Sequence, residues 1–149
     1  MKPKLLVTRE VFDETLAYLG EHCEVESNQQ DVPFDPETLA QRLEDKEGVA
    51  CCLTDRIDDQ LLARCSRLKV AANIAVGYNN IDLAACTARG VMATNTPEVL
   101  TDTTADLAFA LMLATARRLT EVEAYIHNGQ WRGWHLRQLL GVDKWWYTT

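Results

Sequence analysis

Short apolar runs alternate with segments of helical spacing from the N-terminus to about residue 98. The runs are rich in aliphatic and β-branched residues, which is typical of strands, and the segments between them place apolar residues three or four positions apart. The runs predict five strands, at Lys4–Thr8, Cys23–Glu26, Val49–Thr54, Leu68–Asn73 and Val91–Thr94. The segments between them predict four helices, at Glu10–Leu19, Pro36–Leu43, Asp58–Cys65 and Ile81–Arg89.

Capping residues support these helix boundaries. Asp35 precedes Pro36 at one predicted start, Asp58 stands at another, and Gly90 follows the last of the four helices. Strands that alternate with helices form a parallel sheet with helices on both faces, and solidly apolar strands fit a sheet buried on both sides. The sequence therefore predicts an α/β domain at residues 1–98, a flavodoxin-like, doubly wound parallel sheet of five strands.

The pattern changes after this domain. A predicted helix at Thr101–Arg118 is apolar over much of its circumference, which favours burial between two bodies. Thr103-x-x-Asp106 has the spacing of a capping box that opens this helix, and Arg117-Arg118 would complement the helix dipole in its last turn.

A second, amphipathic helix is predicted at Thr120–Asn128, ending before Gly129. The segment after it has no clear periodicity and is rich in large aromatic residues, which favours packing against a partner. These residues are Trp131, Trp134, Trp145, Trp146 and Tyr147. Residues 99–149 are therefore expected to form a second part of the chain, two helices followed by an aromatic arm.

Composition narrows the classes of partner. The net charge of −7 and the pI near 4.9 argue against nucleic acid and against anionic membrane surfaces, since both need basic patches. No apolar stretch approaches membrane-spanning length, and Met1-Lys2-Pro3-Lys4 leads directly into a strand-like run instead of a signal sequence. Five cysteines without a C-x-x-C pair favour reduced, mostly buried thiols, so a cytoplasmic location is expected and no metal site is.

The turn from Asn73 to Asp82 is the main candidate for chemistry. It leaves a predicted strand, passes Gly77 and enters a predicted helix behind two asparagines. Backbone N–H groups that face outward beside a helix N-terminus bind small anions such as carboxylates, and ligands of open α/β sheets bind at the carboxyl ends of the strands. Gly77 would permit a positive φ or a close approach of ligand to the backbone. The same residues also suit a plain strand-to-helix connection.

Histidines offer no alternative site. His22 and His127 lie near predicted helix ends, and His135 lies in the arm. A histidine near a helix C-terminus is more often a favourable charge than an acid/base catalyst, so none of the three is assigned chemistry.

An ordered set of motifs resembles the D-isomer-specific 2-hydroxyacid dehydrogenases, with the glyoxylate/hydroxypyruvate reductase branch nearest. The resemblance spans residues 4 to about 143. It rests on Asn73-x-x-Val76-Gly77-Tyr78-Asn79-Asn80-Ile81-Asp82, Ala88-Arg89-Gly90-Val91, Asn95-Thr96-Pro97, Thr104-Ala105-Asp106-Leu107-Ala108, Leu53-Thr54-Asp55-Arg56-Ile57-Asp58 and Trp131-x-x-Trp134.

The resemblance implies a site for a small 2-oxo or 2-hydroxy acid. It assigns the carboxylate to the backbone N–H groups of Val76 and Gly77, and the pocket wall to Leu53. Leu100 and Thr104 match positions near the nicotinamide and the phosphates of NAD or NADP. Phosphite-oxidising relatives have lysine at the position of Val76, so valine favours an organic acid.

The resemblance also implies a reaction and a partner. The parent reaction is the reversible, NAD(P)-dependent reduction of glyoxylate or hydroxypyruvate, and the helix at Thr101–Arg118 would begin a Rossmann nucleotide-binding domain. The arm at Trp131–Trp134 corresponds to the segment that packs across the dimer of the family, so a homodimer or a heterodimer with an intact homologue is expected.

The residues that the family uses for hydride transfer have no counterparts in this sequence. Its seven glycines include no G-x-G pair, which a dinucleotide cradle needs, and the arginine, glutamate and histidine of the family map beyond residue 149. We expect a truncated Rossmann domain, produced by a frameshift or a premature stop, and no dehydrogenase activity from the isolated chain. The alternative is a carboxylate-binding or regulatory module that pairs with an intact homologue.

Overall fold

A computed structural model describes residues 1–135, 138–139 and 141 of the chain. The chain divides into two compact units, Met1–Val99 and Leu100–Thr149, and each is described by itself. The aromatic residues Trp145, Trp146 and Tyr147 lie outside the described residues.

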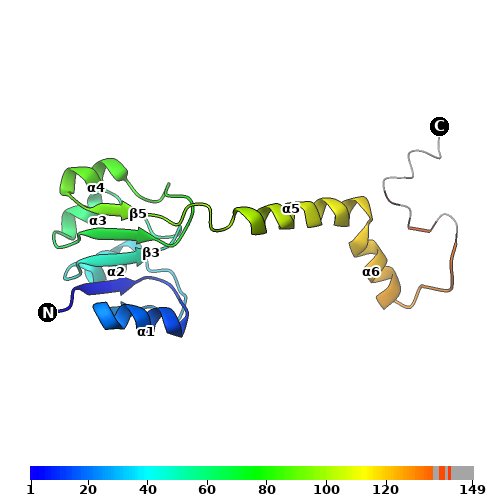
Figure 1. Ribbon diagram of the computed structural model, residues 1–149, viewed down its shortest axis with the longest axis horizontal. Coiled ribbons are helices and arrows are strands. Elements are labelled where there is room, and N and C mark those ends of the chain that lie inside the picture. The colour runs from blue at the N-terminus through cyan, green and yellow to red at the C-terminus, as the bar shows by residue number, and fades with distance from the viewer. Residues whose placement is uncertain (136–137, 140, 142–149) are drawn as a thin grey trace. The chain divides into compact units, whose positions relative to one another are not determined.

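The first unit contains one sheet of five parallel strands in the order β2-β1-β3-β4-β5 (Figure 1). This order is the flavodoxin-like one, so the predicted fold class is confirmed. The strands are β1 (Lys4–Val7), β2 (Glu24–Ser27), β3 (Gly48–Cys51), β4 (Val70–Asn73) and β5 (Met92–Thr94).

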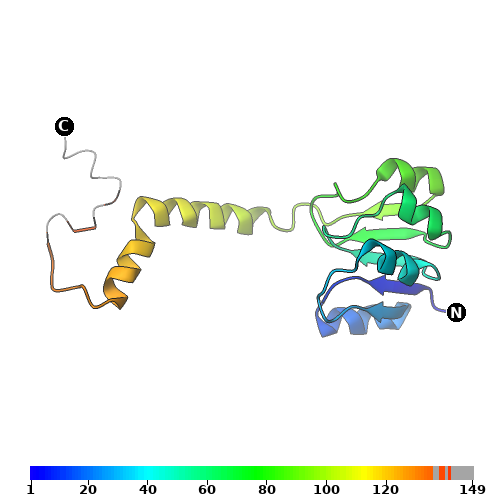
Figure 2. The same cartoon turned by 180° about the vertical axis from the view of Figure 1, so that it is seen from behind.

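Four helices connect these strands and cover both faces of the sheet unequally. Figures 1 and 2 show α1 on one face and the other three helices on the opposite face. The helices are α1 (Asp13–His22), α2 (Pro36–Leu43), α3 (Asp59–Arg64) and α4 (Leu83–Arg89). Burial follows this arrangement, because β3 and β4 alternate between fully and partly buried residues. The expectation of strands buried on both sides is therefore met on one face only.

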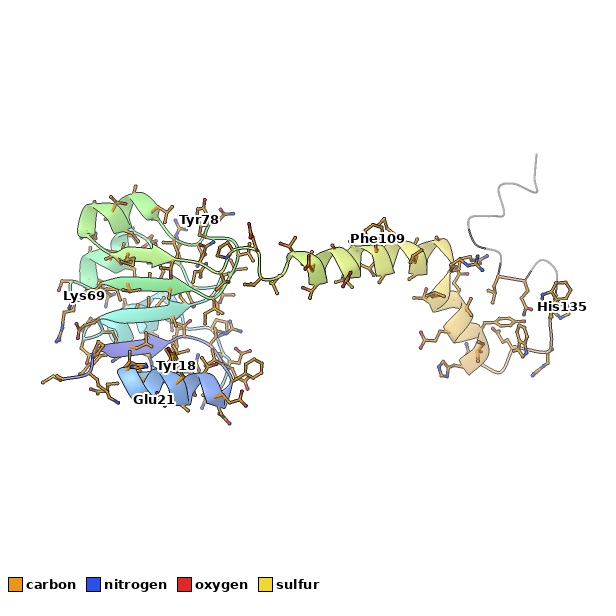
Figure 3. All side chains as sticks on the ribbon, viewed as in Figure 1. Tyr18, Glu21, Lys69, Tyr78, Phe109 and His135 are labelled. Atoms are coloured by element: carbon orange, nitrogen blue, oxygen red, sulfur yellow. The ribbon has the colours of Figure 1, made fainter. Side chains whose placement is uncertain are left out.

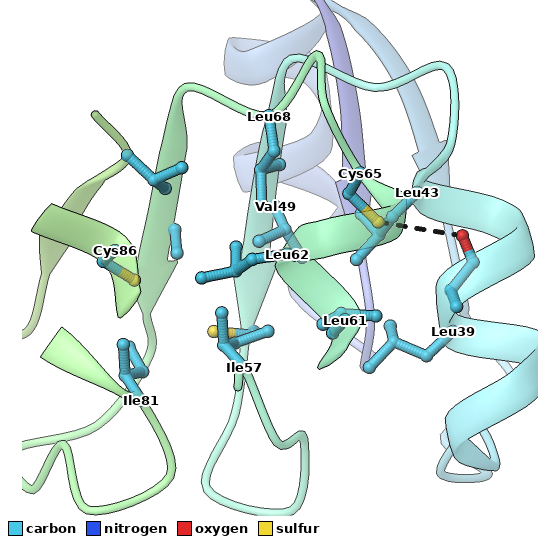
Figure 4. Packing of buried hydrophobic residues seen from close by; sticks show 14 of the residues in the cluster. Leu39, Leu43, Val49, Ile57, Leu61, Leu62, Cys65, Leu68, Ile81 and Cys86 are labelled. Carbon is cyan, nitrogen blue, oxygen red and sulfur yellow. Dashed lines mark hydrogen bonds between the residues drawn. The ribbon is translucent and has the colours of Figure 1, made fainter. Parts of the chain in front are cut away.

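The hydrophobic core lies between the sheet and α2, α3 and α4 (Figure 4). Leu39 and Leu43 come from α2, Leu61 and Leu62 from α3, and all four belong to one buried cluster with Val49 of β3. The Cys65 thiol belongs to the same cluster and lies 3.9 Å from the carbonyl oxygen of Ala40.

The cysteines are all free, as predicted, and Cys51, Cys65 and Cys86 are buried. Desolvation raises the pKa of the Cys51 thiol to about 12 and raises the pKa values of the Cys65 and Cys86 thiols as well. These thiols are packing residues in their neutral form, because a thiolate would have to be stabilised inside the core.

Local capping signals located three helix boundaries correctly. The Asp35 carboxylate accepts hydrogen bonds from the N–H groups of Glu37 and Thr38, and the Asp58 carboxylate accepts one from Leu61. Gly90 ends α4 with a φ of 68°, a left-handed conformation that glycine adopts without strain.

The predicted start of α1 at Glu10 is wrong, because a tertiary contact holds the preceding residues outside the helix. The Asp31 carboxylate accepts hydrogen bonds from the Glu10 N–H and from the Arg9 guanidinium. The helix begins three residues later, where the Phe12 carbonyl oxygen accepts hydrogen bonds from Thr15 and Leu16.

The second unit contains α5 (Thr101–Ala116) and α6 (Leu119–His127). The predicted capping box is wrong, because α5 begins two residues before Thr103, whose hydroxyl donates to the Leu100 carbonyl oxygen at 3.1 Å. The prediction of two arginines in the last turn is also wrong. Arg118 adopts a φ of 54°, which separates the two helices, and it pairs with Glu121.

Neither α5 nor α6 has a buried residue in the structure, and Phe109 of α5 is 64% exposed (Figure 3). Gly129 follows α6 with a φ of 63°, which agrees with the predicted helix end. Within the described residues, no helix is both long and apolar enough to cross a membrane.

A pair of glycine substitutions tests the capping analysis. Gly90→Ala should lower the free energy of unfolding by about 1 kcal/mol, because alanine is strained in the left-handed conformation. Gly20→Ala, inside α1 with open space around the new methyl group, should raise it by about 0.5 kcal/mol. Urea denaturation measures both, and equal effects at the two positions would contradict the analysis.

Asp45 provides a test by pH. Hydrogen bonds from Lys4 and Lys46 lower the pKa of its carboxyl group to about 2, from 3.8. A lowered pKa stabilises the fold above the unfolded value, so this contribution should be lost as the pH falls from about 4 to about 2. The stability difference between the wild type and Asp45→Asn should shrink over that range. Glu21→Gln, at a carboxylate with no ion pair among the described residues, is the control.

Candidate functional site

The loops that follow β1, β3, β4 and β5 meet at one edge of the sheet, because all five strands run in the same direction. In Figure 3, Tyr78 lies at this carboxyl edge and Lys69 lies at the opposite edge, before β4. Ligands of open α/β sheets bind at the carboxyl edge. The loop after β3 carries Leu53, and the loop after β4 carries Val76 and Gly77.

Leu53 and Gly77 face each other across these two loops. A methyl group added at Gly77 would lie 3.9 Å from Cδ2 of Leu53, which is an ordinary van der Waals separation. Gly77 does not adopt a positive φ, so the conformational reason suggested by the sequence is wrong. The absence of a side chain instead leaves the backbone of the β4 loop accessible beside Leu53.

The carbonyl groups of the β4 loop are tied to the protein. The Ala75 oxygen accepts a hydrogen bond from the Thr96 N–H at 2.9 Å, and the Val76 oxygen accepts one from the Asn95 side-chain amide at 2.8 Å. The Gly77 oxygen accepts one from the Asn73 side-chain amide at 2.8 Å. Three consecutive carbonyl groups are therefore fixed by partners within the first unit.

The N–H groups of the same loop differ from its carbonyl groups. Within the described part of the chain, the Val76 and Gly77 N–H groups donate to no protein acceptor. The Val76 side chain is 42% exposed, so the loop lies at the surface. Two adjacent peptide donors held on a fixed backbone are suited to an anion.

The helix that follows contributes little to this anion site. The Asp82 carboxylate caps α4 by accepting a hydrogen bond from the Ala85 N–H at 2.9 Å. A carboxylate already placed at the helix N-terminus opposes a second anion there. The donors belong to the loop itself.

Two asparagine side chains join the loops. Asn73 and Asn80 form a reciprocal amide pair, with N···O distances of 3.0 and 3.2 Å. The Asn80 amide also donates to the carbonyl oxygens of Cys52 at 3.1 Å and Asp55 at 3.0 Å. Sequence reasoning did not identify this role of Asn80, although the repeated Asn79-Asn80 in the turn was a signal for it.

A buried carboxylate fixes the same turn from the other side. Asp55 is 2% exposed, and its Oδ2 accepts hydrogen bonds from the Thr8 hydroxyl and from the Cys52 N–H. Thr8 lies at the end of β1, so this contact joins β1 to the turn after β3. Asp55 was also missed by sequence reasoning, since its partner Thr8 is 47 positions away in the chain.

Two arginines beside the Leu53 turn are already paired. The Arg9 guanidinium donates to Asp31 at 2.8 Å and to the Thr54 hydroxyl at 3.2 Å. This contact raises the pKa of Arg9 and lowers the pKa of Asp31. Arg56 pairs with Asp58 at 3.1 Å. An open hollow between the two loops is lined by Leu53, Thr54, Arg56, Ile57, Asp58, Asn79, Asn80, Ile81 and Asp82.

The two residues predicted for the cofactor lie in the second unit. Leu100 precedes α5 and Thr104 lies one turn into it, and the Thr104 N–H donates to the Leu100 carbonyl oxygen at 2.9 Å. The structure therefore brings these two residues together. No G-x-G pair, the spacing of a dinucleotide-phosphate cradle, occurs in the sequence.

The histidines and metal-ligand types form no further site among the residues that the structure places. His22 contacts Tyr18 edge-on at 5.3 Å, and His127 lies 3.8 Å from Glu123 on α6. No group of three or more His, Cys, Asp or Glu side chains in these residues is arranged to hold a metal ion.

Thr8→Val tests the contact between β1 and the turn. The change keeps the shape of the side chain but removes a donor from the buried Asp55, so the free energy of unfolding should fall by about 1–3 kcal/mol. Thr87→Val, at an exposed hydroxyl on α4, should change it by less than about 0.5 kcal/mol. Urea denaturation distinguishes the two, and an effect of Thr8→Val as small as that of the control would refute the assignment.

The chain matches the family profile described as D-isomer specific 2-hydroxyacid dehydrogenase, catalytic domain, over residues 5–149. Relatives named glyoxylate reductase include one from Korarchaeum cryptofilum, 41% identical over 144 residues, and one from Thermococcus onnurineus, 42% identical over 147 residues. Each alignment covers 96% of this chain and 43% or 44% of the relative. The chain thus spans less than half the length of these relatives.

Solved structures agree with this match. A protein of Thermus thermophilus is 41% identical with a TM-score of 0.84, over 94% of this chain and 45% of that one. An NADPH-dependent glyoxylate/hydroxypyruvate reductase of Sinorhizobium meliloti, in complex with NADP and malonate, is 29% identical with a TM-score of 0.71. That alignment covers 94% of this chain and 41% of the reductase. With the profile match over nearly its whole length, this chain belongs to the family of D-isomer specific 2-hydroxyacid dehydrogenases.

Proposed function

We propose that this chain supplies the carboxylate-binding part of an NAD(P)-dependent D-2-hydroxyacid dehydrogenase that reversibly reduces a small 2-oxo acid such as glyoxylate or hydroxypyruvate. One observation carries the proposal. The Val76 and Gly77 N–H groups have no acceptor among the described residues, whereas the carbonyl groups around them are tied to Thr96, Asn95 and Asn73.

Two neighbouring N–H donors match the two oxygens of a carboxylate. Hydrogen bonds to an ionised acceptor are stronger than those between neutral groups, so a carboxylate is preferred over a neutral amide or alcohol. The net charge of −7 opposes any anion at long range, and the local donors must overcome that repulsion. Malonate in the Sinorhizobium meliloti complex is a small carboxylate, which is consistent with this class of ligand.

The walls of the site favour a short acid. Leu53 lies opposite Gly77, close enough that only a methyl group added at Gly77 would reach van der Waals contact with it, and both belong to the first unit. A side chain on the substrate would have to pass Leu53, which is 60% exposed and apolar. Valine at position 76 supports an organic acid, since the lysine of the phosphite-oxidising relatives is absent.

We assign residues 1–98 to the substrate-binding domain and residues 99–149 to part of the nucleotide-binding domain. Leu100 and Thr104 would then lie near the nicotinamide, which supplies the hydride when it is bound. No residue of these 149 matches the arginine or the histidine of the reaction, and no glycine cradle is present. We therefore propose that these residues alone bind the acid but do not reduce it.

The free cysteines support a cytoplasmic location, since reduced thiols persist in that compartment.

A second candidate function, a binding module that pairs with an intact homologue, is favoured by the exposed aromatic residues Trp131 and Trp134, which are 50% and 75% exposed. Size-exclusion chromatography of this chain mixed with an intact homologue, one of the glyoxylate reductases that it resembles, tests this pairing. A mixed complex that Trp134→Ala abolishes supports it, and separate elution of the two proteins refutes it.

Oxalate, an unreactive analogue of glyoxylate, tests the carboxylate site by calorimetry. The wild type should bind it, and Gly77→Ala should weaken binding by about tenfold or more, because the new methyl group would fill the space toward Leu53. Gly20→Ala, far from the site on α1, is the matched control and should bind as the wild type does. Equal oxalate binding by Gly77→Ala and the wild type would refute the site. In a separate assay, NADH-dependent glyoxylate reduction by the wild-type chain above background would refute the expected inactivity.

A further inference from the structure

We infer that Asn80 is a positioning residue of the carboxylate site, because its side chain holds the Leu53 turn and the Gly77 loop in one fixed arrangement. The inference rests on the proposed function and adds a residue that touches no substrate. Asn80 is partly buried between the two loops, and its amide nitrogen donates to the carbonyl oxygens of Cys52 and Asp55.

Those two acceptors are the ends of a single turn. The Asp55 N–H donates to the Cys52 carbonyl oxygen at 2.9 Å, so residues 52–55 close on themselves and present Leu53 outward. Asn80 binds the first and the last carbonyl group of that turn. Loss of its amide nitrogen would leave the turn held by the buried Asp55–Thr8 contact and by the exposed hydrogen bond from Arg9 to Thr54.

The amide oxygen of Asn80 connects the turn to the second loop. It accepts a hydrogen bond from the Asn73 amide at 3.0 Å, and the same Asn73 nitrogen donates to the Gly77 carbonyl oxygen at 2.8 Å. Asn73 is 2% exposed, and hydrogen bonds between groups shielded from water are stronger than those at the surface. A continuous set of hydrogen bonds therefore runs from both sides of Leu53 to the peptide group that follows Gly77.

The backbone of Asn80 has a separate attachment. Its carbonyl oxygen accepts a hydrogen bond from the Ile57 N–H at 2.9 Å, and the Asp82 N–H donates to the Ile57 carbonyl oxygen at 2.8 Å. These bonds form a parallel bridge between Ile57 and Ile81, which are 0% and 6% exposed. A change confined to the Asn80 side chain leaves this bridge intact, so the fold should survive while the two loops lose their common support.

Asn79 provides a matched control. It has the same side chain at the adjacent position, is exposed, and forms no side-chain hydrogen bond within the part of the chain that the structure describes. Asn79→Asp and Asn80→Asp add the same negative charge beside the same loop. Asn79→Asp reports the effect of a negative charge near the loop, and Asn80→Ala, which adds no charge, reports the loss of the Asn80 amide itself.

The experiment compares oxalate affinity by calorimetry with amide resonances by NMR for the wild type, Asn80→Asp, Asn80→Ala and Asn79→Asp. Both Asn80 variants should weaken oxalate binding by about tenfold or more relative to Asn79→Asp, which corresponds to the loss of one or two net hydrogen bonds. They should also shift the amide resonances of Leu53, Val76 and Gly77 together. Leu43→Val, a substitution in the buried core, should lower stability without changing oxalate affinity.

The outcomes separate this inference from the proposed function. If the wild type does not bind oxalate, the proposed function fails, and joint shifts of Leu53 and Gly77 in the ligand-free variants still decide whether Asn80 couples the loops. The inference is overturned if Asn80→Asp behaves like Asn79→Asp, or if only one loop responds. It is also overturned if Leu43→Val weakens binding equally, or if neither Asn80 variant folds, since Asn80 would then be a general stabilising residue.

Discussion

Backbone polar groups at the carboxyl edge of a parallel sheet lose their ladder partners where the strands end, and the structure depends on how these groups find new ones. In this chain the carbonyl groups are satisfied first. Side-chain amides of Asn73, Asn80 and Asn95 donate to them, while Asp55 accepts from the Cys52 N–H and the Thr8 hydroxyl. The donors of Val76 and Gly77 are left without protein acceptors among the described residues, and this imbalance defines the candidate site.

Local chemistry made much of the fold predictable from the sequence. Asp35, Asp58 and Gly90 act within one helical turn of themselves, so their effects follow from spacing alone. Predictions failed where a distant residue competes with a local signal. Asp31 holds Glu10 outside α1, and no pattern near Glu10 reveals a partner 21 positions away.

The position of the candidate site could be predicted from the sequence, but the hydrogen bonds that hold its loops could not. Strand ends and a glycine placed Leu53 and Gly77 at the same edge, and in the structure a methyl group added at Gly77 would touch Leu53. The positive φ suggested for Gly77 was wrong, because φ depends on the folded backbone, and the capping of α4 by Asp82 was not foreseen. The role of Asn80 depends on carbonyl groups 25 and 28 positions earlier, which become neighbours only in the folded sheet.

The bridge between Ile57 and Ile81 extends parallel pairing beyond the ends of β3 and β4. The bridge joins the residues that follow the Leu53 turn and the Gly77 loop. Each loop is therefore held by a strand before it and by the bridge after it. A receptor built this way undergoes little ordering when a ligand arrives, and most of the interaction energy remains available for affinity. Such loops are poorly suited to act as a moving cover, so under the proposed function the exclusion of water from an acid would have to come from another element.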